Sequence, residues 1–366
     1  MADAVVEVQA FPVVSVIGVR GIPEVVAGAD LAALVHAGIA GGGLAIEPGD
    51  IVVVTSKIVS KAHGRYADST DRRAVVAAET VRVVAERMTS TGATRIVEGR
   101  CGVVSAAAGV DASNTGAGEA ILVLPERPDE AAEQLRAGLA LLAGHDAFGV
   151  IVTDTAGRPW RGGQTDFALG AAGVRVIEDY RGLPDADGRQ LDVTAIAVGD
   201  ELAAAADLVK GKVERIPVAL VRGLGRLVAP DSSVPREGAA RLVRRGPGDF
   251  FAMGHIEAAR AALGAAPGSA ESVAVGIRSV GAEPVSERLA RAVRLAALSL
   301  TDTPSVLEAS GDTEPEARVV LHVPGDDVDL GRLIARLEVA LWSEGLTAHA
   351  ERAGRVLTLR ANGSGG

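Results

Sequence analysis

The sequence predicts a mixed α/β protein made of two parts. Short β-branched runs, such as residues 51–54 and 150–152, are bounded by turn residues, as is typical of buried strands. Between them lie longer segments whose apolar residues recur with helical spacing, such as residues 128–144. Around residues 229–248 the chain becomes rich in Pro, Ser and Gly, which favours two domains, 1–245 and 246–366.

The elements of the first part follow from local signals. Asp30 is expected to cap the helix at 29–40, and a turn at residues 47–50 precedes the strand at 51–54. The small, glycine-rich stretch at 106–118 is expected to be a loop that lets backbone approach a ligand. The expected helices are 29–40, 71–91, 128–144 and 200–209, and the expected strands are 51–54, 120–124, 150–152 and 217–221.

The second part is expected to run helix, strand, helix, strand, helix and a final pair of strands. Residues 285–300 and 329–345 have strongly amphipathic patterns that predict helices. No phosphate-binding loop, metal-ligand cluster or group of arginines is recognisable between residues 249 and 366. We therefore expect this part to contribute packing or association rather than catalysis.

Composition excludes several classes of protein. The formal net charge of -10, with no basic run to offset it, disfavours nucleic acid as a partner. The only cysteine, Cys101, rules out an intrachain disulfide. The amino terminus lacks the basic start of a signal peptide, and no apolar run is long enough to span a bilayer. The sequence therefore predicts a cytoplasmic protein that does not bind membranes.

The use of lysine is unusual. Of the 37 basic residues only four are lysines, and the other 33 are arginines. The lysines form two short clusters, Lys57 with Lys61 and Lys210 with Lys212. Because the chain otherwise uses arginine for positive charge, lysine at these four positions indicates that a compact ammonium is needed there. Contact with nucleotide phosphate is the leading interpretation, and chance survival of surface lysines is the alternative.

The most informative stretch is GVIVTDTAGRPWRGGQTDFALGAAG at residues 149–173. Its β-branched run leads into Thr153, Asp154 and Thr155, which places a carboxylate and two hydroxyls where a strand is expected to leave its sheet. Two arginines, a tryptophan and several further polar groups follow closely, and a plain surface loop is the alternative interpretation. These following side chains are Arg158, Trp160, Arg161, Gln164, Thr165 and Asp166.

Asp111 and Asp154 form a candidate metal pair. Each lies beside an expected strand or turn, and the hydroxyl of Thr155 is adjacent to Asp154. Oxygen donors without a His or Cys cluster suit Mg²⁺ or Mn²⁺ rather than Zn²⁺. The spacing does not establish that the two carboxylates meet, and unpaired surface aspartates are the commoner case.

Taken together, five colinear motifs between residues 11 and 225 resemble the coenzyme F420:L-glutamate ligase family. They are GIPEV at 21–25, VVVTSKIVSKAHGR at 52–65, AAGVDASN at 107–114, VIVTDTAGRPWRGGQTDFALGAAG at 150–173 and AADLVKGKVERIPVALVRG at 205–223. The resemblance implies a mixed α/β ligase domain that forms homodimers. It also implies the reaction, in which GTP, L-glutamate and the deazaflavin F420-0 give F420-1, GDP and phosphate, with further γ-linked glutamates allowed.

The resemblance also implies roles for individual residues. Asp111, Asp154 and Thr155 match positions that bind two divalent ions, Mg²⁺ or Mn²⁺, and a monovalent cation such as K⁺ is allowed. Lys212 stands where the archaeal pattern has a glutamine that reaches the metal, which puts the second ion's ligands in doubt. The positions that match GTP contacts are Ile22, Pro23, Glu24, Val25, Ser56, Lys61, Asn114 and the segment from Lys210 to Pro217, which includes Gly211 and Lys212.

The chemistry of the remaining residues extends this expectation. Amide formation at neutral pH requires an activated carboxylate, most simply an acyl phosphate, and phosphoryl transfer mainly requires positioning and charge neutralisation. We expect Asp154, Lys61 and Arg158 to act in catalysis. The expected substrate-binding residues are Trp160, which offers a stacking surface, with Arg161, Gln164, Thr165 and Asp166.

Two-domain members of this family carry a second domain that resembles an FMN-binding nitroreductase. Residues 246–366 are too few for such a domain and show no flavin-binding match, so FMN is not expected here. We expect this part to be dispensable for the first glutamate addition. Two other functions stay open from the residues alone: a metal-dependent phosphatase or NTPase that uses the same aspartates, and a non-catalytic nucleotide-binding regulator.

Overall fold

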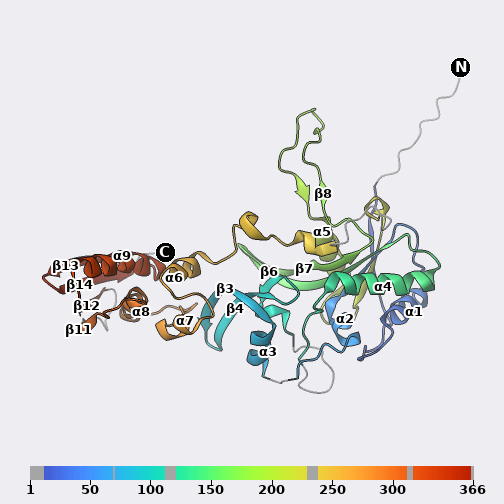
Figure 1. The fold of residues 1–366 in the computed structure, drawn as a ribbon. Helices are drawn as coiled ribbons and strands as arrows, with labels where there is room; N and C mark the ends of the chain where they lie inside the picture. The colour runs from blue at the N-terminus through green and yellow to red at the C-terminus, as the bar shows by residue number, and fades with distance from the viewer. Residues whose placement is uncertain (1–11, 69–70, 112–120, 229–237, 311–315, 364–366) are drawn as a thin grey trace. The chain divides into compact units, whose positions relative to one another are not determined.

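The computed structural model describes residues 12–68, 71–111, 121–228, 238–310 and 316–363 (Figure 1). Helices and strands are mixed throughout, which confirms the predicted α/β class. The chain divides into two compact units. The first comprises the chain up to Glu79 together with Gly99–Gly246, and the second comprises Thr80–Glu98 together with Pro247–Gly366.

The first unit is built on a five-stranded sheet in the order β1-β10-β2-β6-β7. β2 and β6 are parallel, and the other neighbouring pairs are antiparallel. The bounds of these strands are β1 Ser15–Val19, β2 Ile51–Thr55, β6 Gly149–Arg158, β7 Arg161–Ala172 and β10 Val218–Arg222.

Helices cover both faces of this sheet, which explains why its central strands are apolar throughout (Figure 1). On one face, Val52 and Val54 of β2 pack with α1 (Leu31–Gly41) and α4 (Pro128–Ala143). On the other face, Ile51 and Val53 pack with α5 (Val198–Lys210). Alternate residues of one strand therefore belong to different cores.

Most predicted elements of the first unit are present. Asp30 caps α1 by accepting a hydrogen bond from the backbone N–H of Ala33 at 3.0 Å, as expected. The predicted strand at 120–124 is reduced to isolated bridges of Leu122 with Tyr66 and Asp111, and residue 120 lies outside the described residues. The remaining elements are α2 Ser56–Ala62, α3 Arg72–Glu79, β5 Val104–Ala106, β8 Glu178–Asp179, β9 Ala195–Ile196 and the short 3₁₀ segments Ala107–Gly109, Gly225–Leu227, Gly238–Leu242 and Gly246–Gly248.

The helix predicted for residues 71–91 is wrong over most of its length. The helix α3 ends at Glu79, and the chain continues directly as β3 (Thr80–Thr89), whose neighbour is β4 (Gly92–Gly99). Thr80, Val81, Val83 and Val84 are β-branched and favour a strand. The alternation of charged and apolar side chains in this stretch was compatible with a helix pattern, and tertiary packing decides against it.

The second unit joins β3 and β4 to the carboxyl-terminal part of the chain. Its four-stranded antiparallel sheet has the order β11-β12-β14-β13 and packs against α8 and α9. Three helices precede this sheet, so the strand predicted between the first two helices is not present among the described residues. The bounds are α6 His255–Ala262, α7 Ala270–Val275, α8 Val285–Ala297, β11 Ser305–Ser310, β12 Glu316–His322, α9 Asp327–Ser343, β13 Leu346–Ala353 and β14 Val356–Gly363.

Within the described ranges, no helix combines the length and apolar character needed to cross a membrane.

Candidate active site

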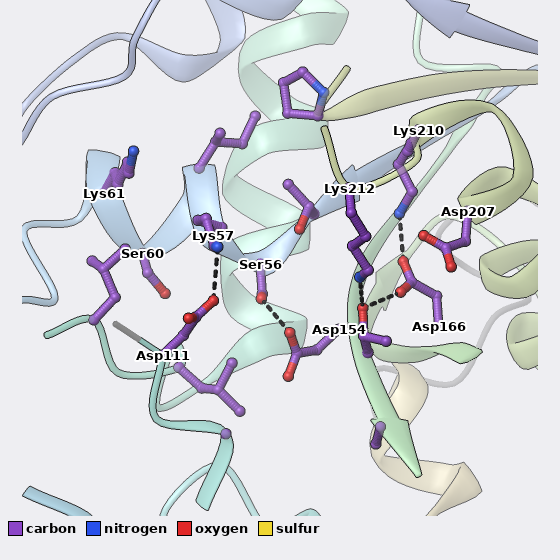
Figure 2. Close-up of a pocket in the computed structure, with 18 of the residues that line it drawn as sticks. Ser56, Lys57, Ser60, Lys61, Asp111, Asp154, Asp166, Asp207, Lys210 and Lys212 are labelled. Carbon is purple, nitrogen blue, oxygen red and sulfur yellow. Dashed lines mark hydrogen bonds and ion pairs between the residues drawn. The ribbon is translucent and has the colours of Figure 1, made fainter. Parts of the chain in front are cut away.

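The first unit contains a cavity of about 1220 Å³ beside the point where β2 ends and its pairing with β6 stops (Figure 2). Carboxyl ends of neighbouring parallel strands commonly hold ligand-binding groups. The residues that line the cavity come from six segments of the first unit: 22–25, 55–61, 105–111, 122–124, 154–157 and 207–217, together with Arg72, Gln164 and Asp166.

The register of the parallel strands brings two of the sequence motifs together. Thr55 pairs with Thr153 in the last pair between β2 and β6. Beyond that pair, the chain after β2 begins the helix α2 at Ser56, while β6 continues against β7 alone. The Ser56 hydroxyl donates a hydrogen bond to Oδ1 of Asp154 at 3.1 Å. The two strand exits therefore form one polar wall.

All four lysines of the chain line this cavity, although they lie in two clusters far apart in the sequence. Lys57 forms an ion pair with Asp111, with 2.7 Å between Nζ and Oδ2. Lys61 pairs with Glu24, and Lys210 pairs with Asp166 at 2.6 Å. Lys212 donates a hydrogen bond to the Thr155 hydroxyl. Figure 2 shows the Lys57 ammonium of α2 directed at Asp111 and the Lys210 ammonium at the end of α5 directed at Asp166.

Asp154 is held in a setting that disfavours its charge. Burial raises the pKa of its carboxyl to about 6, because the hydrogen bonds from Ser56 and from the Thr155 backbone only partly offset the loss of water. The negative charges of Asp166 and Asp111 act in the same direction as burial. An added positive charge beside Asp154 would relieve this strain and favour the ionised carboxylate.

Asp166 is buried but remains favourably charged. Burial opposes ionisation of its carboxyl, but the adjacent Lys210 ammonium and hydrogen bonds from two hydroxyls outweigh burial and lower the pKa. The hydroxyl of Thr153 donates to Oδ2 at 2.8 Å, and that of Thr155 donates to Oδ1 at 2.6 Å. Asp154 and Asp166 thus differ in electrostatic setting although they line the same cavity.

The oxygen donors of the cavity fit a divalent cation. Asp111, Asp154 and Thr155 offer two carboxylates and a hydroxyl, the hard ligands that Mg²⁺ and Mn²⁺ prefer. Among the described residues, no group of three or more His, Cys, Asp or Glu side chains could hold a metal ion by itself. The side chains would therefore supply part of a coordination shell, and Mg²⁺ commonly takes the rest from substrate phosphate and water.

The structure gathers most of the predicted site residues around this cavity and leaves others outside its lining. Asn114 lies outside the described residues. Arg158, Trp160, Arg161 and Thr165 do not line the cavity and belong to the β6–β7 hairpin, where Trp160 is 82 % exposed. The predicted residues that line the cavity are Ile22, Pro23, Glu24, Val25, Ser56, Lys61, Asp111, Asp154, Thr155, Gln164, Asp166, Lys210, Gly211 and Lys212.

Two charged residues of the cavity, Arg72 and Asp207, were missed by sequence reasoning, whereas Arg215 lies within the segment 210–217 that was matched to GTP contacts. Asp207 precedes Lys210 by three positions on α5, so the two side chains share a helix face, and Asp207 could have been predicted from Lys210. No comparable signal marks Arg72, which belongs to α3 and lies within the helix predicted for residues 71–91.

Comparison with known proteins agrees with this geometry. Residues 19–223 match the family model described as F420-0:Gamma-glutamyl ligase. A protein of Halobacterium salinarum named coenzyme F420:L-glutamate ligase is 40% identical over 253 residues, covering 63% of this chain and 93% of its own length. Proteins of the same name from Halorubrum lacusprofundi and Methanopyrus kandleri are 38% and 42% identical over 225 and 195 residues. These two alignments cover 56% and 49% of this chain, and 85% and 77% of the relatives. More than half of the chain matches the family model, and the matched residues include nearly all of the cavity, so the chain belongs to the F420-0:gamma-glutamyl ligase family.

Proposed function

We propose that this protein joins L-glutamate to the deazaflavin F420-0 in a reaction driven by GTP. The observation that carries this proposal is the gathering of all four lysines with Asp111 and Asp154 around one cavity. A ligand with several phosphate oxygens matches such a site, because ammonium groups neutralise phosphate and carboxylates bind the accompanying divalent ion. The family membership supplies the reaction class.

In the proposed first step, a carboxylate oxygen of F420-0 attacks the γ-phosphorus of GTP and GDP departs. This step forms an acyl phosphate and requires no protein nucleophile, so positioning and charge neutralisation are the tasks of the protein. Lys57, Lys61, Lys210 and Lys212 are the cations available to the phosphates. Asp111, Asp154 and Thr155 would hold Mg²⁺ or Mn²⁺, which when bound supplies further charge neutralisation on the phosphate oxygens.

In the proposed second step, the glutamate amine attacks the acyl carbon. The new C–N bond forms as the bond between carbon and the phosphate oxygen breaks, and the departing phosphate takes up the proton that the amine nitrogen loses. Asp207, the cavity carboxylate that was missed from sequence, lies three positions before Lys210, one of the lysines that would hold the departing phosphate. Further glutamates, joined by γ-linkage, would repeat the same two steps.

The β6–β7 hairpin is the proposed holder of the organic substrates. Gly157 and Gln164 form a cross-strand pair within the cavity lining, and the next pair toward the turn is Arg158 with Arg161. The hairpin tip is therefore a continuation of the cavity wall. We assign Trp160 to stacking on the deazaflavin ring and the two arginines to carboxylates or phosphate of the substrates.

A turnover assay tests the proposal against its alternatives. Purified protein with GTP and Mn²⁺ should release phosphate only when both F420-0 and L-glutamate are present, and mass spectrometry should detect F420-1. Phosphate release without F420-0 would instead identify a GTPase or phosphatase. GTP binding with no phosphate release under any combination would identify a nucleotide-binding regulator. Sedimentation at the assay concentration would test the proposed homodimer.

A further inference from the structure

Three protein groups donate hydrogen bonds to the Asp166 carboxylate. Its Oδ2 accepts hydrogen bonds from the Lys210 ammonium at 2.6 Å and from the Thr153 hydroxyl at 2.8 Å. Its Oδ1 accepts one from the Thr155 hydroxyl at 2.6 Å. Asp166 and Lys210 are each only 4% exposed, and Thr153 is fully buried. Asp166 therefore has little acceptor capacity left for a substrate, in contrast to the substrate-binding role expected from sequence.

These contacts fix the direction of the Thr155 hydroxyl. A hydroxyl has one proton to donate and two lone pairs that accept, whereas an ionised carboxylate can only accept. The proton between Thr155 and Asp166 must therefore come from Thr155. The Thr155 oxygen then has only lone pairs left for the cavity, and the group that it meets there, the Lys212 ammonium, can only donate.

We infer that Asp166 is a positioning residue, which holds the Thr155 hydroxyl so that it offers only lone pairs to a cation in the cavity. The inference rests on the proposed function for the identity of that cation, which is a divalent ion or the Lys212 ammonium. Figure 2 shows the chain of contacts from Lys210 through Asp166 and Thr155 to Lys212. The buried ammonium of Lys210 is the first donor in this series of hydrogen bonds.

The substitution Asp166→Asn is expected to reverse this direction with little change of shape. The Lys210 ammonium can only donate, so it requires the single carboxamide oxygen of asparagine on its side. The carboxamide NH₂ group then faces Thr155 and donates to its oxygen. The Thr155 proton is displaced toward the cavity, where it opposes Lys212 and any metal ion.

The test is a double-mutant cycle on Mn²⁺ affinity, measured by electron paramagnetic resonance in the presence of GTP. Asp166→Asn and Thr155→Val should each weaken Mn²⁺ binding about ten- to a hundredfold, the range for loss of a hydrogen bond or contact to a charged group. The double variant should be no weaker than Thr155→Val, because Asp166 acts through Thr155. Thr155→Ser keeps the hydroxyl and should bind Mn²⁺ nearly as the parent does.

Three results would overturn the inference. They are an unchanged Mn²⁺ affinity in Asp166→Asn, losses that add in the double variant, and absence of Mn²⁺ binding by the parent, which would also remove the proposed metal site. If Asp166→Asn fails to fold, as judged from its melting temperature, the inference is tested by comparing the Mn²⁺ affinities of Thr155→Val and Thr155→Ser. Equal Mn²⁺ affinities of these two variants would reject it. Ligase turnover of the parent, assayed in parallel, separates the two proposals, since an intact cycle without turnover rejects only the proposed function.

Discussion

At the scale of single residues, Asp154 is a proposed metal ligand whose ionised carboxylate is disfavoured by burial. Its pKa of about 6 in the folded protein lies above the value near 4 of an exposed aspartate. A carboxyl whose pKa is raised by folding stabilises the fold below its unfolded pKa, and that contribution is lost as the pH rises through the folded pKa. Without metal, the charge of Asp154 should therefore destabilise the protein above about pH 6.

The substitution Asp154→Asn removes this charge and tests the argument. In metal-free protein at pH 8, Asp154→Asn should be more stable than the parent by about 1–3 kcal/mol, and the difference should shrink at pH 4. Urea unfolding in the presence of a chelator measures both values. The same variant should lose ligase turnover because a proposed metal ligand is gone. A parent protein that gains stability from pH 4 to pH 8 relative to the variant would contradict the argument, as would near-normal turnover with Mn²⁺.

Lys61 tests whether the chain needs ammonium groups or only positive charge. Its side chain is 5% exposed, lines the cavity and pairs with Glu24. Lys61→Arg keeps the charge but introduces a wider, planar group with fixed donor directions. Turnover per GTP should fall at least about tenfold, the typical effect of losing one charged hydrogen bond.

The matched control for Lys61 is the reverse exchange at a solvated position, Arg127→Lys. The Arg127 side chain is 74% exposed and, among the described residues, forms an ion pair with Glu130 in the first turn of α4, so its exchange should leave turnover and melting temperature almost unchanged. If Lys61→Arg were as active as the parent, the lysine clusters would be an accident of composition. The phosphate contact would then have to be sought at Lys57, Lys210 or Lys212.

At the scale of elements, β7 combines a tightly packed glycine with an open one. A Cβ atom at Gly170 would overlap the carbonyl group of Pro128, the first residue of α4, whereas a Cβ at Gly162 would meet no atom within 4 Å. The close approach of α4 to the sheet therefore depends on the missing side chain at Gly170. This contact helps to fix the strand that carries Asp166.

Gly170→Ala should consequently lower the free energy of unfolding by about 1–3 kcal/mol or more, as overpacking in a well-packed interior does. Gly162→Ala on the same strand should change it by less than about 0.5 kcal/mol. Chemical unfolding of the two variants provides the comparison. Equal stabilities would mean that α4 can shift away from β7 without cost.

At the scale of the whole molecule, the second unit is not simply a carboxyl-terminal attachment. It includes Thr80–Glu98, which the chain contributes from the middle of the ligase region. Glu86 of β3 is 4% exposed, and its Oε1 accepts hydrogen bonds from the Ser272 hydroxyl at 2.5 Å and the Gly268 N–H at 3.1 Å. The only partner of this carboxylate within residues 80–98 in the described structure is Arg95, at 3.1 Å.

A fragment that ends at Gly246 should therefore be poorly soluble or show rapid hydrogen exchange at residues 80–98. Removing the tail leaves the Glu86 carboxylate without two of its donors and exposes apolar surface of β3. This expectation differs from the prediction from sequence that the tail is dispensable for the first glutamate addition, and the fragment tests both. A second fragment, in which a short Gly-Ser link also replaces 80–98, is the control and should be more soluble. A fragment ending at Gly246 that retains protected amides at 80–98 would show that β3 and β4 fold without the tail.

Local patterns in the sequence were sufficient for much of the fold. Three features could be predicted because the residues that signal each of them lie within one element. They are the apolar run of β2, the cap of α1 and the amphipathic face of α8. The same holds for the clustering of lysines and for the motifs that mark the family. The stretch at 71–91 was misread because its pattern suited both a helix and a strand, and the choice depended on partners from residues 247–366.

The sequence by itself thus determined the α/β class, the family and most of the charged residues that line the cavity. Only the tertiary structure decided which charges neutralise one another, because Lys210 and Asp166 lie 44 positions apart and meet through the packing of α5 on the sheet. It likewise decided that the Asp166 carboxylate accepts hydrogen bonds from Lys210, Thr153 and Thr155, and that Thr80–Glu98 belongs with the tail. Pairing between distant segments depends on strand register and helix packing, and no local pattern of residues encodes either of them.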